Sequence, residues 1–318
     1  MTDPLRALVL PPLGSLPLSR AATDRDGEAR PTEHFLDDLW ASADTRVLPL
    51  ARGKAPVVGN ALRLLGPADL ARPAMVVYLG RVDEGYADAG RRVVLAVFDE
   101  EDAAVAPLGQ WLGLREIAAS LDARDTGLFV AGAAIANWHA THTHCPRCGA
   151  ATVPTHAGWV RRCPRDGSEH YPRTDPAIIV SIIDDDDRIL LGSAVAWPED
   201  RYSTLAGFVE PGESLEAAVV REVGEESGIR VESPEYLGSQ PWPFPASLMV
   251  GFTARAANTD AVPDREEVRS LRWFTREELF AEVRDEKIVV AGGVSIARAM
   301  IERWYGGPLD EEPSEARP

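Results

Sequence analysis

The stretch that most constrains this chain is GFVEPGESLEAAVVREVGEESGI, residues 207–229, because it places four glutamates and an arginine around one short predicted helix. These side chains are Glu213, Arg221, Glu222, Glu225 and Glu226. Carboxylates held this close repel one another, and a hard divalent cation such as Mg²⁺ relieves the repulsion. The stretch therefore predicts a metal site.

Local signals favour the helix itself. Ser214 is placed to cap its N-terminus, and Gly228 is placed to stop it. An apolar stripe recurs at spacings of three and four: Leu215, Ala218, Val219 and Val223. Continuing that spacing reaches Glu222 and Glu226, so the acids should share or border the buried side. The structural alternative is a solvated acidic helix, whose acids would lie on the opposite side.

The spacing of the whole stretch resembles the complete Nudix box, GX5EX7REUXEEXGU, in which U is aliphatic. Every fixed position from Gly207 to Ile229 matches. The resemblance implies an α/β fold, the Nudix α/β/α sandwich with a mixed sheet. It also implies hydrolysis of a nucleoside diphosphate linked to another moiety, on a loop–helix–loop that binds two or three Mg²⁺ or Mn²⁺ ions.

Composition narrows the setting of such a site. With 318 residues the chain is long enough for two domains, and 33 basic against 50 acidic residues give a net charge of -17. This charge opposes unspecific attraction to nucleic acid or to anionic membranes. No apolar run is long enough to span a membrane, and prolines interrupt the apolar N-terminal patch, which argues against a secretory signal. Three cysteines fit the cytoplasm better than a secreted disulfide framework.

Changes in pattern divide the chain into four regions. They are an N-terminal α/β domain over 1–140, a small zinc-ribbon-like segment over 141–175, a catalytic domain over 176–305 and a disordered tail over 306–318. In the first region strands are expected over 75–80 and 91–99, helices over 114–121 and 128–139, and loops over 24–31 and 52–59. In the third, strands are expected over 177–184, 188–193, 202–206, 248–255 and 271–274, and helices over 276–283 and 295–305.

The cysteines form a zinc-ribbon pattern with one position changed. Cys145-Pro-Arg-Cys148 is a tight turn that aims two thiolates at one point, and Cys163 opens a second Cys-Pro-Arg turn that ends in Asp166. Asp166 occupies the place of a fourth cysteine and is the first choice for the fourth ligand. Histidine nitrogen is the alternative, from His170 or, less well placed, His156. A structural zinc ion is expected; the competing interpretation is a metal-free ribbon with buried or reactive cysteines.

A proline-rich motif, SQPWPFPAS, follows the box at residues 239–247. Its alternating prolines remove donors that a central strand would need, so a stiff loop is predicted. Downstream of a Nudix box this motif resembles the array of NADH pyrophosphatases of the NudC type, which also carry an N-terminal α/β domain and a zinc ribbon. The resemblance implies cleavage of NAD(H) to nicotinamide mononucleotide and AMP, removal of NAD caps from RNA 5′ ends, and a homodimer.

The resemblance also assigns roles to individual residues. The metal ligands would be Ala206 through its carbonyl, Glu222, Glu225, Glu226 and Glu267. Glu225 would be a further ligand or the general base, and Arg221 would orient the acids. The substrate contacts would be Arg115, Tyr171, Phe208, Gln240, Pro241, Trp242, Pro243, Phe244, Pro245, Ala246, Ser247 and Ala297. For Arg115 a surface ion pair, and for Ala297 a packed helix position, are equally good interpretations.

Two other functions compete with NAD(H) hydrolysis. One is a Nudix hydrolase of ADP-ribose or diadenosine polyphosphates, which the proline-rich motif disfavours. The other is a non-catalytic RNA-binding module that uses the arginine-rich ribbon, which the intact acidic box disfavours. The spacing alone does not choose among NADH, NAD⁺ and NAD-capped RNA, nor does it say which glutamate is the base.

Overall fold

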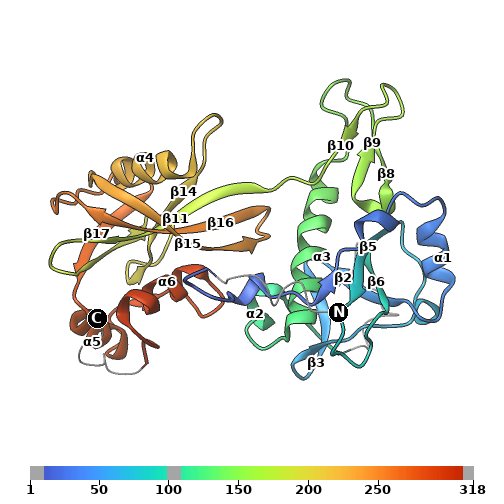
Figure 1. The fold of residues 1–318 in the computed structure, drawn as a ribbon, viewed down its shortest axis with the longest axis horizontal. Helices are drawn as coiled ribbons and strands as arrows, with labels where there is room; N and C mark the ends of the chain where they lie inside the picture. Colours follow the sequence, from blue (N-terminus) through green and yellow to red (C-terminus); the bar gives the residue numbers. More distant parts are fainter. Residues whose placement is uncertain (1–10, 99–108, 311–318) are drawn as a thin grey trace. The chain divides into compact units, whose positions relative to one another are not determined.

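The structure is a computed structural model that describes residues 11–98 and 109–310 (Figure 1). Residues 1–10, position 99 of an expected strand and residues 311–318 of the expected tail lie outside the described part. The chain forms two compact units. The first comprises Met1–Pro17, Asp175–Gln240 and Ser247–Pro318, and the second comprises Leu18–Thr174 and Pro241–Ala246.

A mixed sheet forms the centre of the first unit. In the described residues its order is β15-β16-β11-β12-β17, with β14 paired to β11. β11 runs parallel to β16 and antiparallel to β12 and β14. The strands are β11 (Asp175–Ile183), β12 (Ile189–Ala194), β14 (Leu205–Phe208), β15 (Val231–Trp242), β16 (Ser247–Ala256) and β17 (Val268–Phe274). The single strand expected over 202–206 is divided between β14 and β13 (Arg201–Tyr202), which pairs with β18 (Val289–Val290).

Helices cover both faces of this sheet. They are α4 (Leu215–Ser227), α5 (Arg276–Arg284) and α6 (Ile296–Tyr305). Alternation along β11 sends Val180 into the core beneath α4 and its neighbour Ile179 into the core beneath α6. Figure 1 shows α4 and α6 on opposite sides of the strands. The α/β/α sandwich predicted from the box is confirmed.

The helix ends follow the predicted signals. Ser214 Oγ accepts a hydrogen bond from Ala217 N at 3.2 Å, and Gly228 ends α4 in the left-handed region with φ 67°. Thr275 and Ser295 cap α5 and α6. The prediction of disorder from residue 306 is wrong at Leu309, which is buried against the α5–α6 core and donates its N–H to Glu302.

The second unit begins with another mixed sheet. In the described residues its order is β1-β5-β6-β2-β3-β4, with β7 paired to β3. The strands are β1 (Thr23–Asp24), β2 (Arg46–Ala51), β3 (Lys54–Val58), β4 (Ala61–Leu62), β5 (Met75–Val82), β6 (Arg92–Phe98) and β7 (Gln110–Gly113). The helices are α1 (Phe35–Ala41), α2 (Leu114–Ile117) and α3 (Ala123–Thr141). An α/β N-terminal domain is therefore confirmed.

The loop predicted over 52–59 is wrong, because most of it is strand β3. Arg52 and Gly53 form a turn before β3, with φ of 49° and 73°, and Gly59 begins the turn after it, with φ of 60°. Proline lacks a donor but keeps its acceptor, and the carbonyl of Pro56 accepts from Arg63 N at 2.8 Å. The proline therefore sits in β3 without leaving the strand unpaired.

A small three-stranded sheet completes the second unit. It consists of β8 (Val153–Thr155), β9 (Val160–Arg162) and β10 (Glu169–His170). Ala157, between β8 and β9, packs in the same core as Phe35 and Tyr78, and Trp159 Nε1 donates to the Tyr78 carbonyl at 2.6 Å. The ribbon therefore packs directly against the N-terminal sheet. Within residues 11–98 and 109–310, no helix has the length and apolar character needed to cross a bilayer.

Acidification is expected to destabilise the second unit through His139. This side chain is 5% exposed, its Nε2 lies 2.8 Å from the Gly158 carbonyl, and its Nδ1 accepts from Arg161 at 3.0 Å. Burial lowers the pKa of His139 from 6.5 to about 4. Below about pH 6.5 the unfolded chain binds this proton and the folded protein does not, so the free energy of unfolding should fall by about 2 kcal/mol between pH 7 and pH 5.

Urea unfolding of the protein and of His139→Gln at these two pH values measures the effect. The variant cannot titrate, so its stability should change less with pH. Equal pH dependence of the two proteins would contradict the assignment.

Candidate functional site

Arg221 organises the acidic end of α4. Its guanidinium donates to both carboxylate oxygens of Glu213, at 2.6 and 3.2 Å, and to the Phe208 carbonyl at 2.9 Å. It also contacts Glu222 and Glu225, each at 3.0 Å. These contacts raise the pKa of Arg221 and lower that of Glu213. One cation therefore aligns three of the four predicted acids with the strand that precedes the helix.

Glu226 is the acid that the protein leaves unsatisfied. It is 6% exposed, and its Oε2 has no hydrogen-bond partner. Burial, followed by the charges of Glu222 and Glu267, raises the pKa of Glu226 to about 8, while a hydrogen bond from the Ala206 backbone opposes the shift. Ala206 therefore bonds to Glu226 through its backbone, and the charges of Glu222 and Glu267 lie within electrostatic reach of Glu226. A buried carboxylate oxygen surrounded by like charges fits a divalent cation.

The proline-rich motif is half strand and half turn. The prediction of a loop is wrong for Ser239–Trp242, which lies in β15. β15 is the edge strand of its sheet, and an edge strand tolerates proline because its outer side has no neighbouring strand to pair with. Phe244–Pro245 has a cis peptide bond, and Asn137 donates to the carbonyls of Pro243 and Pro245 at 2.9 and 3.2 Å.

Arg115 packs on the aromatic side chains of this motif. Its guanidinium lies 4.0 Å from the ring centre of Phe244 and 5.1 Å from that of Trp242, and the two rings meet edge to face. In the second unit these contacts preorganise the turn. The ion pair offered as an alternative for Arg115 is therefore replaced by a cation–π contact.

The other expected substrate contacts differ in accessibility. Phe208 and Tyr171 are exposed, and the Tyr171 hydroxyl donates to Glu169 at 2.9 Å. Gln240 is 0% exposed and donates to the Val294 carbonyl, and Ala297 is 2% exposed in the core beneath α6. Ala297 thus occupies the packed helix position. For all four residues, contact with substrate stays a prediction.

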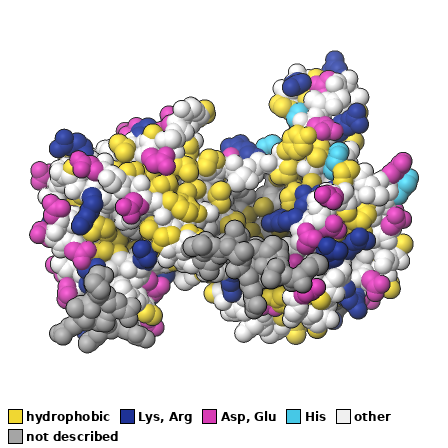
Figure 2. Space-filling model, viewed as in Figure 1, with side chains coloured by type: hydrophobic (Ala, Val, Ile, Leu, Met, Phe, Trp, Pro, Cys, Tyr) yellow, Lys and Arg dark blue, Asp and Glu magenta, His cyan; other side chains and the backbone are white. Residues whose placement is uncertain are grey.

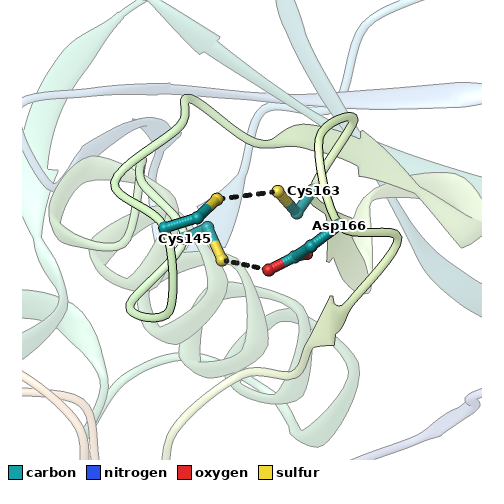
Figure 3. A group of neighbouring side chains, drawn as sticks. Cys145, Cys163 and Asp166 are labelled. Atoms are coloured by element: carbon teal, nitrogen blue, oxygen red, sulfur yellow. Dashed lines mark hydrogen bonds between the residues drawn. The ribbon is translucent and has the colours of Figure 1, made fainter.

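The two Cys-Pro-Arg turns converge on one point (Figure 3). One ligand atom from each of Cys145, Cys148, Cys163 and Asp166 lies within 4.8 Å of the others. Cys148 Sγ and Cys163 Sγ are 3.5 Å apart, close to the ~3.8 Å that tetrahedral zinc with Zn–S of ~2.3 Å requires. Cys145 Sγ lies 3.5 Å from Asp166 Oδ2.

The two turns share one hydrogen-bond pattern. Gly149 N donates to the Cys145 carbonyl and Gly167 N to the Cys163 carbonyl, and both glycines have positive φ, 71° and 74°. Asp166 therefore stands where the second turn would carry its second cysteine. His170 lies behind Ser168, whose hydroxyl bridges it to Asp166 at 3.1 and 2.6 Å. The donor set of three sulfurs and one carboxylate fits zinc, with His170 outside it.

Family models cover most of the chain in three adjacent segments. Residues 172–291 match the NUDIX domain, residues 140–171 the NADH pyrophosphatase zinc ribbon domain, and residues 42–138 the NADH pyrophosphatase-like rudimentary NUDIX domain. A protein from Mycobacterium bovis (strain BCG / Pasteur 1173P2) named NAD-capped RNA hydrolase NudC is 38% identical over a 311-residue alignment that covers 92% of this chain and 96% of the relative. The chain belongs to the NudC-type NADH pyrophosphatases of the Nudix superfamily.

Other members of this family are similar over shorter or equal spans. The protein of the same name from Mycobacterium tuberculosis (strain ATCC 25618 / H37Rv) is also 38% identical over a 311-residue alignment that covers 92% of this chain and 96% of that relative. The human NAD-capped RNA hydrolase NUDT12 is 36% identical over a 196-residue alignment that covers 58% of this chain and 42% of the human protein.

Sequence reasoning missed two residues of this Nudix protein's site. Asn137 lies more than a hundred positions from the carbonyls it binds, and nothing local to it signals that contact. Asp264 had a signal, because an aspartate just before a strand commonly accepts the following backbone N–H groups. Its carboxylate does so, beside Glu267.

Replacing Gly207 by alanine is expected to abolish most activity without unfolding the protein. A Cβ at Gly207 would lie 2.0 Å from the carboxyl carbon of Glu222, so the added methyl group must displace that carboxylate. We expect kcat to fall at least about 100-fold, or about 2.7 kcal/mol. Gly224→Ala is the matched control, because a Cβ there meets nothing within 4 Å. It should keep kcat and stabilise the helix by about 1 kcal/mol.

Proposed function

We propose that this protein hydrolyses the pyrophosphate of NAD(H) to nicotinamide mononucleotide and AMP, and that it removes NAD caps from RNA 5′ ends. The observation that carries the proposal is the likeness over almost the whole chain to proteins named NAD-capped RNA hydrolase. The matches to NADH pyrophosphatase domains on both sides of residue 140 support the same substrate class.

The acids of α4 supply the reaction site in this proposal. Glu222, Glu226, Glu267 and the Ala206 carbonyl would hold two or three Mg²⁺ or Mn²⁺ ions. When bound, such ions neutralise a pyrophosphate and lower the pKa of a coordinated water. Among these acids Glu226 alone combines deep burial with an unpartnered oxygen, so it is the ligand we expect to matter most.

The neighbouring residues have three other roles in this proposal: proton transfer, orientation of the acids and stacking on the substrate. Glu225, whose side chain is 62% exposed, is our candidate for the group that accepts the proton of the attacking water. Arg221 holds Glu225 and Glu222 in place, so it orients the acids and need not touch the substrate. Phe208 in the first unit and Tyr171 in the second each have an exposed ring, and an exposed ring of this kind can stack on a base.

The wider setting is also proposed. We place the enzyme in the cytoplasm as a homodimer, with a structural zinc ion at Cys145, Cys148, Cys163 and Asp166. The cysteines are free, as expected in a reducing compartment. The four regions 1–140, 141–175, 176–305 and 306–318 remain our proposed division of function along the chain.

Capped RNA must be recognised mainly through its cap. The net charge is -17, and on the face drawn in Figure 2 acidic side chains are interspersed among the basic ones. Contacts with RNA phosphates should therefore be few, and decapping should depend less steeply on salt than binding by a basic protein does.

The test compares kcat/KM for NADH, NAD⁺, NAD-capped RNA, ADP-ribose and diadenosine polyphosphates with Mg²⁺ or Mn²⁺ present. The expected products from the NAD substrates are nicotinamide mononucleotide and AMP, or 5′-monophosphate RNA. Faster cleavage of ADP-ribose or of diadenosine polyphosphates than of any NAD substrate would favour the competing Nudix activity. No cleavage of any pyrophosphate would leave the RNA-binding alternative.

A further inference from the structure

The turn that leads into β17 is organised by one carboxylate. Asp264 Oδ1 accepts the backbone N–H groups of Glu266 and Glu267, each at 3.2 Å, and of Val268 at 2.8 Å. Its Oδ2 also accepts from Glu267 N at 3.2 Å. A single side chain therefore binds three successive N–H groups, and the middle one belongs to Glu267.

The turn has one further internal hydrogen bond, from Arg265 N to the Val268 carbonyl at 3.0 Å. Asp264, Arg265, Glu266 and Glu267 are all exposed, and Arg265 has a φ of 66°, which is uncommon for a residue with a side chain. On the inner side the Glu267 carbonyl accepts from Val195 N at 2.8 Å, and Val268 begins the pairing with β12. The backbone of Glu267 is thus held between the sheet and the Asp264 carboxylate.

Val268, the neighbour of Glu267, packs in the same core as Val219 and Val223 of α4. The charges of Glu267 and Asp264 both act on Glu226, which places the turn within electrostatic reach of the helix. We infer that Asp264 is a positioning residue, which holds the turn that presents Glu267 to Glu226 and so preorganises the cation site. The inference rests on the proposed function through one point, the role of Glu267 as a ligand.

The competing hypothesis is that the negatively charged carboxylate of Asp264 binds the cation directly. The geometry separates the two roles, because Oδ1 alone accepts from all three N–H groups. Asparagine keeps the Oδ1 acceptor of all three bonds and loses the charge, together with the additional 3.2 Å contact of Oδ2 with Glu267 N. If Asp264 positions the turn, Asp264→Asn should behave like the parent protein; if it binds the cation, Asp264→Asn should behave like Asp264→Ala.

The experiment measures the dissociation constant for Mn²⁺ from the electron paramagnetic resonance signal of the free ion, together with kcat and KM for NAD⁺. The proteins are the parent, Asp264→Ala, Asp264→Asn and Glu267→Gln. Asp260→Ala is the matched control, because Asp260 is an exposed acid of the same loop. Melting temperatures without metal show whether each variant folds.

Asp264→Ala should weaken Mn²⁺ binding about tenfold and lower kcat more than it raises KM, as expected when the support of a ligand is lost. Asp264→Asn should stay within about twofold of the parent in both. Equal losses in the two variants, a loss in Asp264→Ala no greater than in Asp260→Ala, or unchanged Mn²⁺ binding by Glu267→Gln would each overturn the inference. If the Mn²⁺ dissociation constants change as expected but the parent protein does not cleave NAD⁺, the proposed function is rejected and the inference about Asp264 stands.

Discussion

Glu226→Gln should lower kcat for NAD⁺ about 1000-fold while the protein stays folded, a loss of about 4 kcal/mol of transition-state stabilisation. The amide keeps the shape of the side chain and removes the charge that a divalent cation needs. Glu226 Oε2 has no hydrogen-bond partner, so no internal contact is lost with the charge. The measurement is steady-state hydrolysis with saturating Mg²⁺.

The same substitution should leave the metal-free protein as stable as before, or more stable. An unpaired carboxylate in a buried position is unfavourable, and the neighbouring charges of Glu222 and Glu267 add to the penalty. In the parent protein Mg²⁺ should raise the melting temperature, and in Glu226→Gln it should not. Glu216→Gln, on an exposed position of the same helix, is the matched control. Near-normal turnover of Glu226→Gln would contradict the assignment of Glu226 as a ligand.

The helix that carries this site was predictable because its signals are local. Ser214, Gly228 and the apolar stripe lie within the helix or next to it, so the sequence places the ends and the buried side correctly. The depth of Glu226 also followed, since it continues the stripe of Val219 and Val223. The set of contacts made by Arg221 could not be predicted. Its bond to the Phe208 carbonyl depends on how the chain passes from β14 into α4.

The errors have a common physical cause, which is pairing between distant segments. Lys54–Val58 was expected to be a loop because it contains a proline beside a glycine turn, but β7, some fifty residues later, pairs with it as a strand. Ser239–Trp242 was expected to be a loop because alternating prolines remove backbone donors, but this segment lies in an edge strand, where a proline is acceptable. Proline restricts one residue, whereas strand pairing depends on the whole sheet.

Loss of the zinc site should have the second largest effect, this time on stability. Cys163→Ser should bind no zinc and should lower the melting temperature of the second unit by about 10 °C, for a loss of about 3 kcal/mol. Cys145 and Cys163 are both buried, and burial raises the pKa of the Cys163 thiol to about 11. Without a cation that thiol stays protonated, and the two Cys-Pro-Arg turns are no longer joined by zinc coordination. Zinc content and thermal unfolding, with and without a chelator, measure the effect.

The identity of the fourth ligand follows from a comparison of two variants. Asp166→Ala should lose most of the zinc, because Asp166 occupies the ligand position of the second turn and lies within 4.8 Å of the three sulfurs. His170→Ala should keep one zinc ion per chain, because His170 lies outside the group of four converging ligand atoms and hydrogen-bonds to Ser168. The opposite result would make His170 the ligand and Asp166 its support. Asp166→Cys should bind zinc at least as tightly as the parent, since the two turns share one backbone pattern and thiolate is the softer ligand.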